Sequence, residues 1–345
     1  MAVPVTFTLP QGLNASAPPE RRGIRRDHVR LMISDRQTGK TVHTRFYQLA
    51  RYLRPGDVIV LNTSRTVPAV LQASWMREES VLSTATEIRL AHRYDEENWD
   101  AMVVAEGVRA GDRFHFSPSL FATVVAVREQ SPLLRLRFSL RGSDLYEQIY
   151  ALGEPVRYEY IKQPWDLDYY QTVYASVPGS VELPSAGRAF SWEILLQLQK
   201  KGVQIAYLIL HTGLSYLLDD RFKMKPEENC EQFVISPETA QVINRAKQAG
   251  HRIIAVGTTV VRALESAALS DGTCLAKQGW TCLHIDEHTS LKIADGLMTG
   301  FHEPEASHLD LLSAFVSPPL LTGMYREAIQ ERYLWHEFGD IHLII

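Results

Sequence analysis

The sequence is poor in cysteine, and its few cysteines are widely spaced. Only Cys230, Cys274 and Cys282 occur among 345 residues, and none forms a C-x-x-C pair. Structural zinc sites and small disulfide frameworks depend on several cysteines at short, regular spacings. We therefore expect neither a zinc site nor a disulfide framework. This use of cysteine is typical of a reducing cytoplasm.

Long apolar segments are absent as well. No run approaches the roughly 18 apolar residues that a membrane-spanning helix requires. The N-terminal stretch 1–10 contains neither the basic segment nor the apolar core of a secretory signal. We therefore expect a cytoplasmic protein that has no membrane partner.

The sequence also lacks a strong excess of charge. Its formal net charge is −4, so no bulk basic field is present to attract nucleic acid, and any contact with RNA needs a local patch. One local basic run exists, with five arginines between Arg21 and Arg30. This run is either a solvated surface segment or an arm that contacts phosphate groups.

Several familiar catalytic motifs are missing. The sequence has no G-x-G-x-x-G fingerprint, no Walker motif, no G-x-S-x-G and no H-E-x-x-H. A nicotinamide dehydrogenase is therefore not expected, and no bound metal ion is expected either.

The pattern along the chain predicts two domains. A chain of 345 residues is too long for one ordinary core. Short alternating segments, separated by turn residues, fill the stretch 66–149 and predict a small antiparallel β-barrel. We expect this barrel to be inserted into a larger α/β domain that uses residues 1–65 and 150–345.

The second half of the chain alternates helices and strands. Ser191 and Ser236 are good N-cap residues for two helices, and the apolar segment 203–210 is typical of a strand between them. Such alternation predicts a mainly parallel sheet, in which ligands bind beyond the carboxyl ends of the strands. This rule places His211–Gly213 and Gly257–Thr259 at one edge of the sheet.

The segment Gly250–Ser266 is the most informative part of the sequence. Ile253–Val256 is typical of a buried strand, and Thr258 and Thr259 can cap the helix that follows. A strand that ends at glycine and opens a helix leaves free N–H groups for an anionic or polar ligand. The alternative is a well-capped helix in which Arg262 and Glu265, three residues apart, form a surface ion pair.

Three loops contain further candidate residues. Pro178–Ser191 is rich in small residues, so a ligand could approach its backbone closely, although it could also be an ordinary structural loop. His211 and His302 each follow or enter a loop and could transfer protons near neutral pH. The alternatives are a core histidine at position 211 and a solvated loop around position 302.

Together these segments resemble the S-adenosylmethionine:tRNA ribosyltransferase-isomerase family of the queuosine pathway. The resemblance runs nearly end to end, and the string A-V-G-T-T-x-V-R-x-L-E-S within Gly250–Ser266 is its most specific part. The other matching segments, in chain order, are Asp35–Gly39, Leu53–Asp57, Leu61–Asn62, Arg65, Pro68–Ala69, Tyr170–Ala175, Pro178–Val181, Pro184–Gly187, Leu210–Leu214, Phe301–Pro304, Ser313–Phe315 and Gly339–Asp340.

The resemblance implies a large α/β domain with a β-barrel insertion and an unusual use of S-adenosylmethionine. The family transfers and isomerises the ribosyl group of this co-substrate onto 7-aminomethyl-7-deazaguanine in tRNA, and releases adenine and methionine. Such a site needs a base, a proton donor near adenine and dipoles that hold the methionine carboxylate.

The sequence departs from the family pattern at sensitive places. Family histidines are replaced by Ala189, Phe222 and Lys225, and a family lysine is replaced by Glu305. These positions fall in segments expected to line the pocket. Three hypotheses therefore stay open: the family reaction on tRNA, a paralog that uses another, small-molecule acceptor, and a non-catalytic binding protein on the same scaffold.

The expected site combines the helix start with the loops around it. Candidate catalytic residues are His211, His302 and Glu265, although the sequence does not decide which group is the base, and it leaves the oligomeric state open. The candidate substrate-binding residues are Gly257, Thr258, Thr259, Arg262, Ser185, Ala186, Gly187, Arg188, Gly213 and Tyr174.

Overall fold

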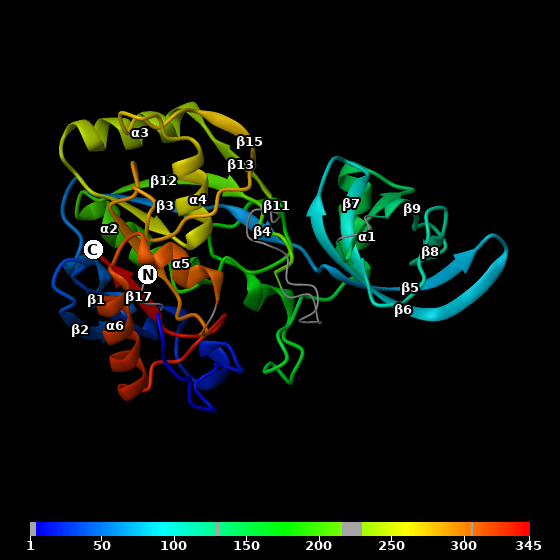
Figure 1. The fold of residues 1–345 in the computed structure, drawn as a ribbon, viewed down its shortest axis with the longest axis horizontal. Coiled ribbons are helices and arrows are strands. Elements are labelled where there is room, and N and C mark those ends of the chain that lie inside the picture. Colours follow the sequence, from blue (N-terminus) through cyan, green and yellow to red (C-terminus); the bar gives the residue numbers. More distant parts are fainter. Residues whose placement is uncertain (1–4, 128–130, 216–229, 305) are drawn as a thin grey trace.

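The protein consists of a large sheet flanked by helices and a separate small barrel (Figure 1). The computed structural model describes residues 5–127, 131–215, 230–304 and 306–345. The barrel strands lie between Val70 and Phe138, helix α1 after them packs on the barrel, and most of the remaining described chain surrounds the sheet. This is the α/β fold with an inserted antiparallel barrel that the sequence predicts. The exact domain limits of 66 and 149 stay a prediction.

The sheet has nine strands, in the order β15-β13-β12-β3-β14-β16-β17-β1-β2. Its central strands β12, β3, β14 and β16 are parallel, whereas most outer pairs are antiparallel, so the sheet is mixed and the predicted parallel part is confined mainly to the centre. The strands are β1 Arg30–Ser34, β2 Thr41–Arg45, β3 Val58–Asn62, β12 Gln204–Leu210, β13 Glu231–Ile235, β14 Ile253–Val256, β15 Lys277–Thr281, β16 Gly296–Thr299 and β17 Ile341–Ile344.

Alternating side chains of β3 pack into two different hydrophobic cores. Val58 and Val60 belong to the core beneath α3, α4, α5 and α6, whereas Ile59 and Leu61 belong to the core beneath α2. Because both faces of this strand are covered, its sequence is a continuous apolar run, as expected for a central parallel strand. The helices are α2 Trp192–Lys200, α3 Pro237–Gln248, α4 Thr258–Ser266, α5 Ser307–Ser313 and α6 Pro318–Gln330.

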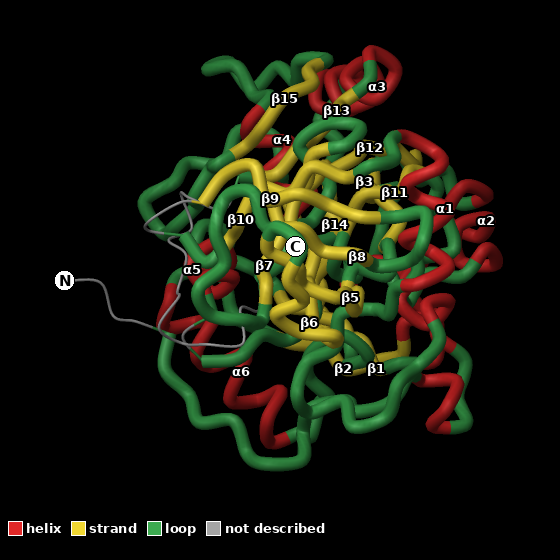
Figure 2. Tube along the Cα trace, turned by 90° about the vertical axis from the view of Figure 1, so that its right-hand side faces the viewer, coloured by secondary structure: helices red, strands yellow, loops and turns green. Residues whose placement is uncertain are grey.

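The barrel is closed by six antiparallel strands and has a core of its own. Helix α1, Gly142–Leu152, packs Leu145 and Ile149 into that core. In Figure 2 the barrel strands are seen in front of the sheet. The strands are β5 Val70–Arg77, β6 Ser80–Arg93, β7 Asn98–Val103, β8 Arg113–His115, β9 Phe121–Val127 and β10 Leu133–Phe138.

Two short strands connect the sheet domain with the barrel (Figure 1). β4, Ser64–Thr66, follows β3 and pairs in parallel with β11, Val177–Ser180. Of the helix caps, Ser191 and Ser236 accept hydrogen bonds from the first turns of α2 and α3, as the sequence predicts. Among the described residues, no helix is long and apolar enough to cross a membrane.

Candidate active site at the carboxyl ends of the central strands

A cavity of about 390 Å³ lies where the parallel strands β12, β14 and β16 end. The loops after these strands contribute Gly213, Gly257 and His302 to its wall. This is the position that the strand-end rule predicts for a ligand. The wall contains, among others, Tyr158, Glu182, Ser185, Ala186, Thr212, Gly213, Ser215, Glu231, Gly257, Thr258, Thr259, Arg262, Thr299, His302, Glu303, His308, His336 and Glu337.

The start of α4 differs in one detail from the prediction. Gly257, not a threonine, is the N-cap, and its φ of 100° belongs to the region that favours glycine. Thr258 is already helical, and no side chain caps the helix. Since the first N–H groups of a helix have no acceptor within the helix, this end of α4 offers donors to a ligand in the cavity.

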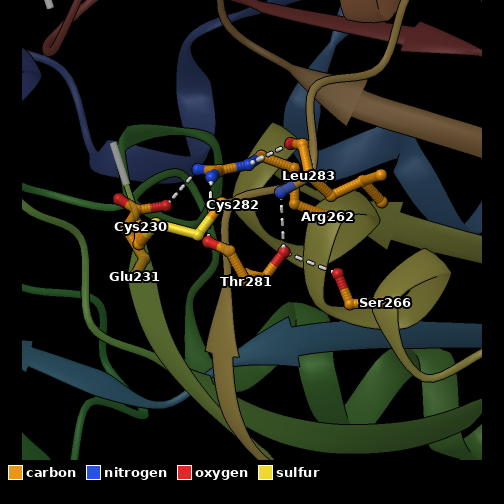
Figure 3. Close-up of a disulfide and its surroundings, with 7 residues drawn as sticks. All are labelled: Cys230, Glu231, Arg262, Ser266, Thr281, Cys282 and Leu283. Carbon is orange, nitrogen blue, oxygen red and sulfur yellow. Dashed lines mark hydrogen bonds and ion pairs between the residues drawn. A yellow bond between two sulfur atoms is a disulfide. The ribbon is translucent and has the colours of Figure 1, made fainter. Parts of the chain in front are cut away.

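Arg262 lines the cavity, but its guanidinium is engaged by the protein itself. It forms an ion pair with buried Glu231, and its Nε donates to the Leu283 carbonyl at 3.0 Å (Figure 3). A further N–H donates to the Thr281 carbonyl at 3.3 Å. Because Arg262 also lines the cavity, its predicted contact with the substrate stays a prediction. Its donors tie α4 to β13 and to the segment after β15.

A disulfide next to this ion pair corrects the expectation drawn from cysteine spacing. Cys230 and Cys282 are bonded, with Cα atoms 4.2 Å apart (Figure 3). Their neighbours Glu231 and Thr281 face each other in the antiparallel pair β13–β15. Because pairing of distant strands brings the two cysteines together, their separation of 52 residues gave no signal. Cys274 is buried and free, and burial raises the pKa of its thiol to about 11.

Glu265 does not form the surface ion pair that the alternative interpretation of Gly250–Ser266 expects. Its carboxylate accepts hydrogen bonds from the backbone N–H groups of Lys292, Ile293 and Ala294, at 2.8 to 3.0 Å. It lies outside the described lining of the cavity. Its contacts fix the loop before β16.

His211 also lies outside the described lining. Its Nδ1 is 2.7 Å from the hydroxyl oxygen of Ser64, which is itself 2.6 Å from the hydroxyl oxygen of Ser180. Burial, with a smaller effect of Arg93, lowers the pKa of His211 to about 4. His211 therefore joins the strand ends at β4 and β11, and it is neutral at pH 7.

His302 is the one predicted catalytic residue in the described wall of the cavity. Its Nε2 is 2.8 Å from the hydroxyl oxygen of Thr299, and its ring stacks on His308 with centroids 4.3 Å apart. Burial, followed by the nearby histidines, holds the pKa of His302 well below its usual range. The ring is therefore neutral at pH 7 and can act as a hydrogen-bond partner or as a base.

The loop after β11 contributes Ser185 and Ala186 to the cavity, while the next residues lie behind it. Buried Arg188 donates to the Tyr169 carbonyl at 2.7 Å and pairs with Glu20 at 2.8 Å. At Gly187, an added Cβ would approach the Tyr174 hydroxyl to 2.1 Å. Gly187, Arg188 and Tyr174 therefore support the loop from outside the described lining.

The basic run between Arg21 and Arg30 is held against the protein. Arg22 donates to the Phe338 carbonyl at 2.7 Å, Arg26 pairs with Glu20 at 3.2 Å, and Arg30 pairs with Glu331 at 3.2 Å. These contacts occupy guanidinium groups that a phosphate-binding arm would need.

Residues that sequence reasoning missed form another part of the cavity wall. Tyr158, Glu337 and His308 stand in segments without a recognisable motif, whereas Glu182 lies in the predicted loop Pro178–Ser191, although it was not itself a candidate. Glu337 lies only two residues before the Gly339–Asp340 match, and its position gave no chemical signal. Of the altered family positions, Ala189 is buried in the core beneath α2, whereas Phe222, Lys225 and Glu305 lie outside the described residues.

Comparison with known proteins identifies the family. The family model described as "Queuosine biosynthesis protein" matches residues 4–344. The chain belongs to this family. It is 36% identical over 349 residues to S-adenosylmethionine:tRNA ribosyltransferase-isomerase of Clostridium kluyveri, and 37% identical over 350 residues to the protein of that name from Carboxydothermus hydrogenoformans. Each alignment covers 98% of both proteins.

A solved structure agrees with this assignment. The crystal structure of the S-adenosylmethionine tRNA ribosyltransferase from Thermotoga maritima matches with a TM-score of 0.55 and 30% identity, and the match covers 99% of each chain. The protein is thus an enzyme of the ribosyltransferase-isomerase type in queuosine biosynthesis. In the part of the chain that the structure describes, no three His, Cys, Asp or Glu side chains gather to hold a metal ion.

Proposed function

We propose that the cavity at the strand ends binds S-adenosylmethionine and performs the ribosyl transfer and isomerisation on 7-aminomethyl-7-deazaguanine in tRNA. The observation that carries this proposal is the meeting of Gly257–Thr259, the Ser185–Ala186 loop and His302 in one cavity. These three segments come from the family-like parts of the sequence, and they share one site although they are far apart along the chain. We place this reaction in the cytoplasm.

The chemistry of the co-substrate defines what the cavity must supply. The sulfonium group acidifies the neighbouring 5′ carbon, so that a base can remove a proton there and adenine can leave. The amine of the acceptor then attacks the ribosyl group, and methionine departs as the epoxide closes. A base and fixed dipoles near the developing charges are the groups that accelerate these steps.

The start of α4 is the proposed site for the methionine carboxylate. Gly257, Thr258 and Thr259 line the cavity, and the helix presents its first N–H groups there. Arg262 stabilises this end indirectly, because its own donors bind Glu231 and two carbonyl groups. Ser185, Ala186 and Gly213 supply small surfaces at which the substrate can approach the backbone.

His302 is the proposed acid–base residue. It is neutral, lies in the cavity wall and is oriented by Thr299 and by the stacked ring of His308. His211 and Glu265 act through their neighbours, since the structure gives them partners outside the described lining.

One assay tests the proposal. The purified protein is incubated with S-adenosylmethionine, with and without tRNA that carries the deazaguanine precursor, and the products are separated. We expect adenine and methionine only when the tRNA is present. Adenine release with a small amine in place of tRNA would indicate a paralog with another acceptor. S-adenosylhomocysteine would indicate methyl transfer and contradict the proposal, and tight binding without turnover would indicate a binding protein.

A further inference from the structure

Glu337 is a buried carboxyl group in the cavity wall that the proposed chemistry does not yet use. It lies between α6 and β17, beside Tyr158 and Glu182 in the cavity lining, and is 9% exposed. Its Oε2 atom is buried and has no hydrogen-bond partner among the described residues. Because an unpartnered buried polar atom is costly, its position at a cavity wall points to a partner from outside the chain.

The surroundings of Glu337 determine its charge when no ligand is bound. Burial, and next the neighbouring Glu182, raise the pKa of Glu337 well above its usual range, while Arg188 lowers it. Arg188 already forms an ion pair with Glu20 at 2.8 Å, so its positive charge is partly neutralised by Glu20. These surroundings therefore favour the neutral, protonated form of Glu337 in the unliganded protein.

The neighbouring carboxylate is held in a fixed position. Glu182 accepts from the Ser215 N–H at 2.6 Å, from the Ser215 hydroxyl at 2.7 Å and from the Tyr158 hydroxyl at 3.4 Å. Further along the wall, His336 lies 2.6 Å from Glu303 and stacks on Tyr160. This part of the cavity therefore presents ordered carboxyl groups, whereas the start of α4 presents N–H groups.

We propose that Glu337, next to Glu182, forms a subsite for a primary ammonium group of a substrate. An ammonium group has three donors, and it would supply both a partner for the Glu337 Oε2 atom and a positive charge between the two carboxyl groups. Its binding releases the proton of Glu337 to the solvent, which leaves a carboxylate paired with the ammonium.

The subsite rests on the proposed function, because that reaction offers two sources of the ammonium group. One is the methionine half of S-adenosylmethionine, and the other is the aminomethyl group of the tRNA base. Both sources have the same chemistry at the subsite. They differ in which substrate depends on Glu337.

Calorimetric titration of the full chain with S-adenosylmethionine, in two buffers of different ionisation enthalpy, measures the proton release. The variants are Glu337→Gln, which keeps the shape but cannot ionise, and Glu79→Gln, a control in an exposed turn. If the methionine amine is the source, the wild type and the control release a proton that Glu337→Gln does not release. The affinity of Glu337→Gln for S-adenosylmethionine then falls about tenfold or more relative to the wild type. For an S-adenosylmethionine analogue that lacks the amino group, the two proteins have the same affinity.

If the tRNA base is the source of the ammonium group, S-adenosylmethionine binds equally to the wild type, the control and Glu337→Gln. Proton release then accompanies the titration of the wild type with precursor tRNA, and Glu337→Gln shows no such release and a raised Kd for the tRNA. Equal proton release and equal affinity in wild type and Glu337→Gln, for both substrates, would overturn the proposal. This readout is a binding measurement, so failure of turnover in the wild type would contradict the proposed function separately.

Stability of the unliganded variant separates a ligand-binding role from a structural one. The folded state raises the pKa of Glu337, so ionisation opposes folding, and the wild type loses stability as the pH rises above the unfolded value. Glu337→Gln removes this penalty, and we expect its Tm at pH 8 to equal or exceed that of the wild type. A lower Tm at pH 8, together with unchanged binding, would indicate a structural residue and overturn the subsite.

Discussion

The barrel and the nine-stranded sheet bury their apolar strands in different ways. The barrel pairs strands from one stretch of chain, Val70–Phe138, mostly with near neighbours, and closes on a core of its own. The sheet collects strands from Arg30 to Ile344, and its central strands are far apart in sequence. Of these two regions, only the sheet has parallel strands among its described residues, and the described lining of the cavity comes entirely from outside the barrel.

The difference between the two regions indicates where a catalytic site can form. A closed antiparallel barrel satisfies its own backbone and fills its interior with side chains, so it supplies surface and stability. Parallel strands end together and leave loops and helix starts at one edge, where polar groups from distant segments converge. The two regions meet where Gly213, after β12, contacts His92 of β6. Substitutions in each region can show how independent barrel and sheet are of each other.

The largest expected effect concerns the disulfide of the sheet domain. A bond that closes a loop of 52 residues stabilises by up to about 4 kcal/mol in the chain-entropy view. The variant Cys230→Ser with Cys282→Ser should therefore lower the melting transition of the sheet domain and leave that of the barrel in place. Scanning calorimetry measures this. A reducing agent should not change the melting transitions of the double variant. If both transitions fall together, the two regions unfold as one unit.

The next effect concerns turnover. His302→Ala should reduce the release of adenine and methionine about a hundredfold or more, if the ring transfers a proton. The matched control is His115→Ala in barrel strand β8, which should retain turnover within about twofold. Product release under saturating substrates distinguishes the two. Near-normal turnover of His302→Ala would remove this residue from the proposed chemistry.

A smaller effect is expected from a polar network inside the barrel. Buried Asp112 accepts from Arg77 at 2.8 and 2.9 Å, from the Trp75 indole at 3.0 Å and from the Arg109 N–H at 2.9 Å. Asp112→Ala leaves these donors unpaired and should destabilise the barrel by about 2 kcal/mol. We expect the affinity of the folded protein for S-adenosylmethionine to stay unchanged, as measured by calorimetric titration.

This network also has a pH dependence whose direction the structure determines. Although burial alone would raise the pKa of Asp112, its bonds from Arg77 and the other donors lower it in the folded state. Its contribution to stability is therefore complete above the unfolded value of about 3.9 and is lost as the pH falls through the folded value. The difference in Tm between wild type and Asp112→Ala should shrink below pH 4. A constant difference down to pH 2 would contradict the assignment.

The smallest effect tests the contact between the two regions. A Cβ at position 213 would lie 1.8 Å from the ring of His92, so Gly213→Ala should cost about 1–2 kcal/mol and reduce turnover. His92→Ala removes the obstructing ring. Thermal unfolding and turnover of the double variant should therefore recover toward those of His92→Ala alone. Additive losses would mean that the contact does not couple barrel and sheet.

Much of the local structure could be predicted from the sequence. Ser191 and Ser236 cap their helices as expected, because a cap depends on residues only three positions apart. The strand, glycine turn and helix at Gly250–Ser266 are equally local. Even there, the N-cap is Gly257, one residue before the first predicted cap, Thr258, since Gly257 adopts a conformation that the threonines avoid.

The partners of the predicted site residues could not be predicted. Arg262 suits a carboxylate ligand by type, yet Glu231 and two carbonyl groups occupy it. The partners of Glu265 lie 27 to 29 residues further along the chain, and Ser64, the partner of the His211 ring, lies more than 100 residues before it. Spacing and composition contain no information about contacts of this kind, because they arise when distant strands pair.

Many of the strands and helices, the two-part architecture and the family thus follow from the sequence alone, since periodicity, caps and motifs are properties of neighbouring residues. Which polar groups share the cavity depends on the tertiary structure. It joined Cys230 to Cys282, engaged Arg262 inside the protein and placed Glu337 at the wall. The physical reason is that burial and charge act through space, so a carboxyl group acquires its chemistry from whatever the fold packs around it.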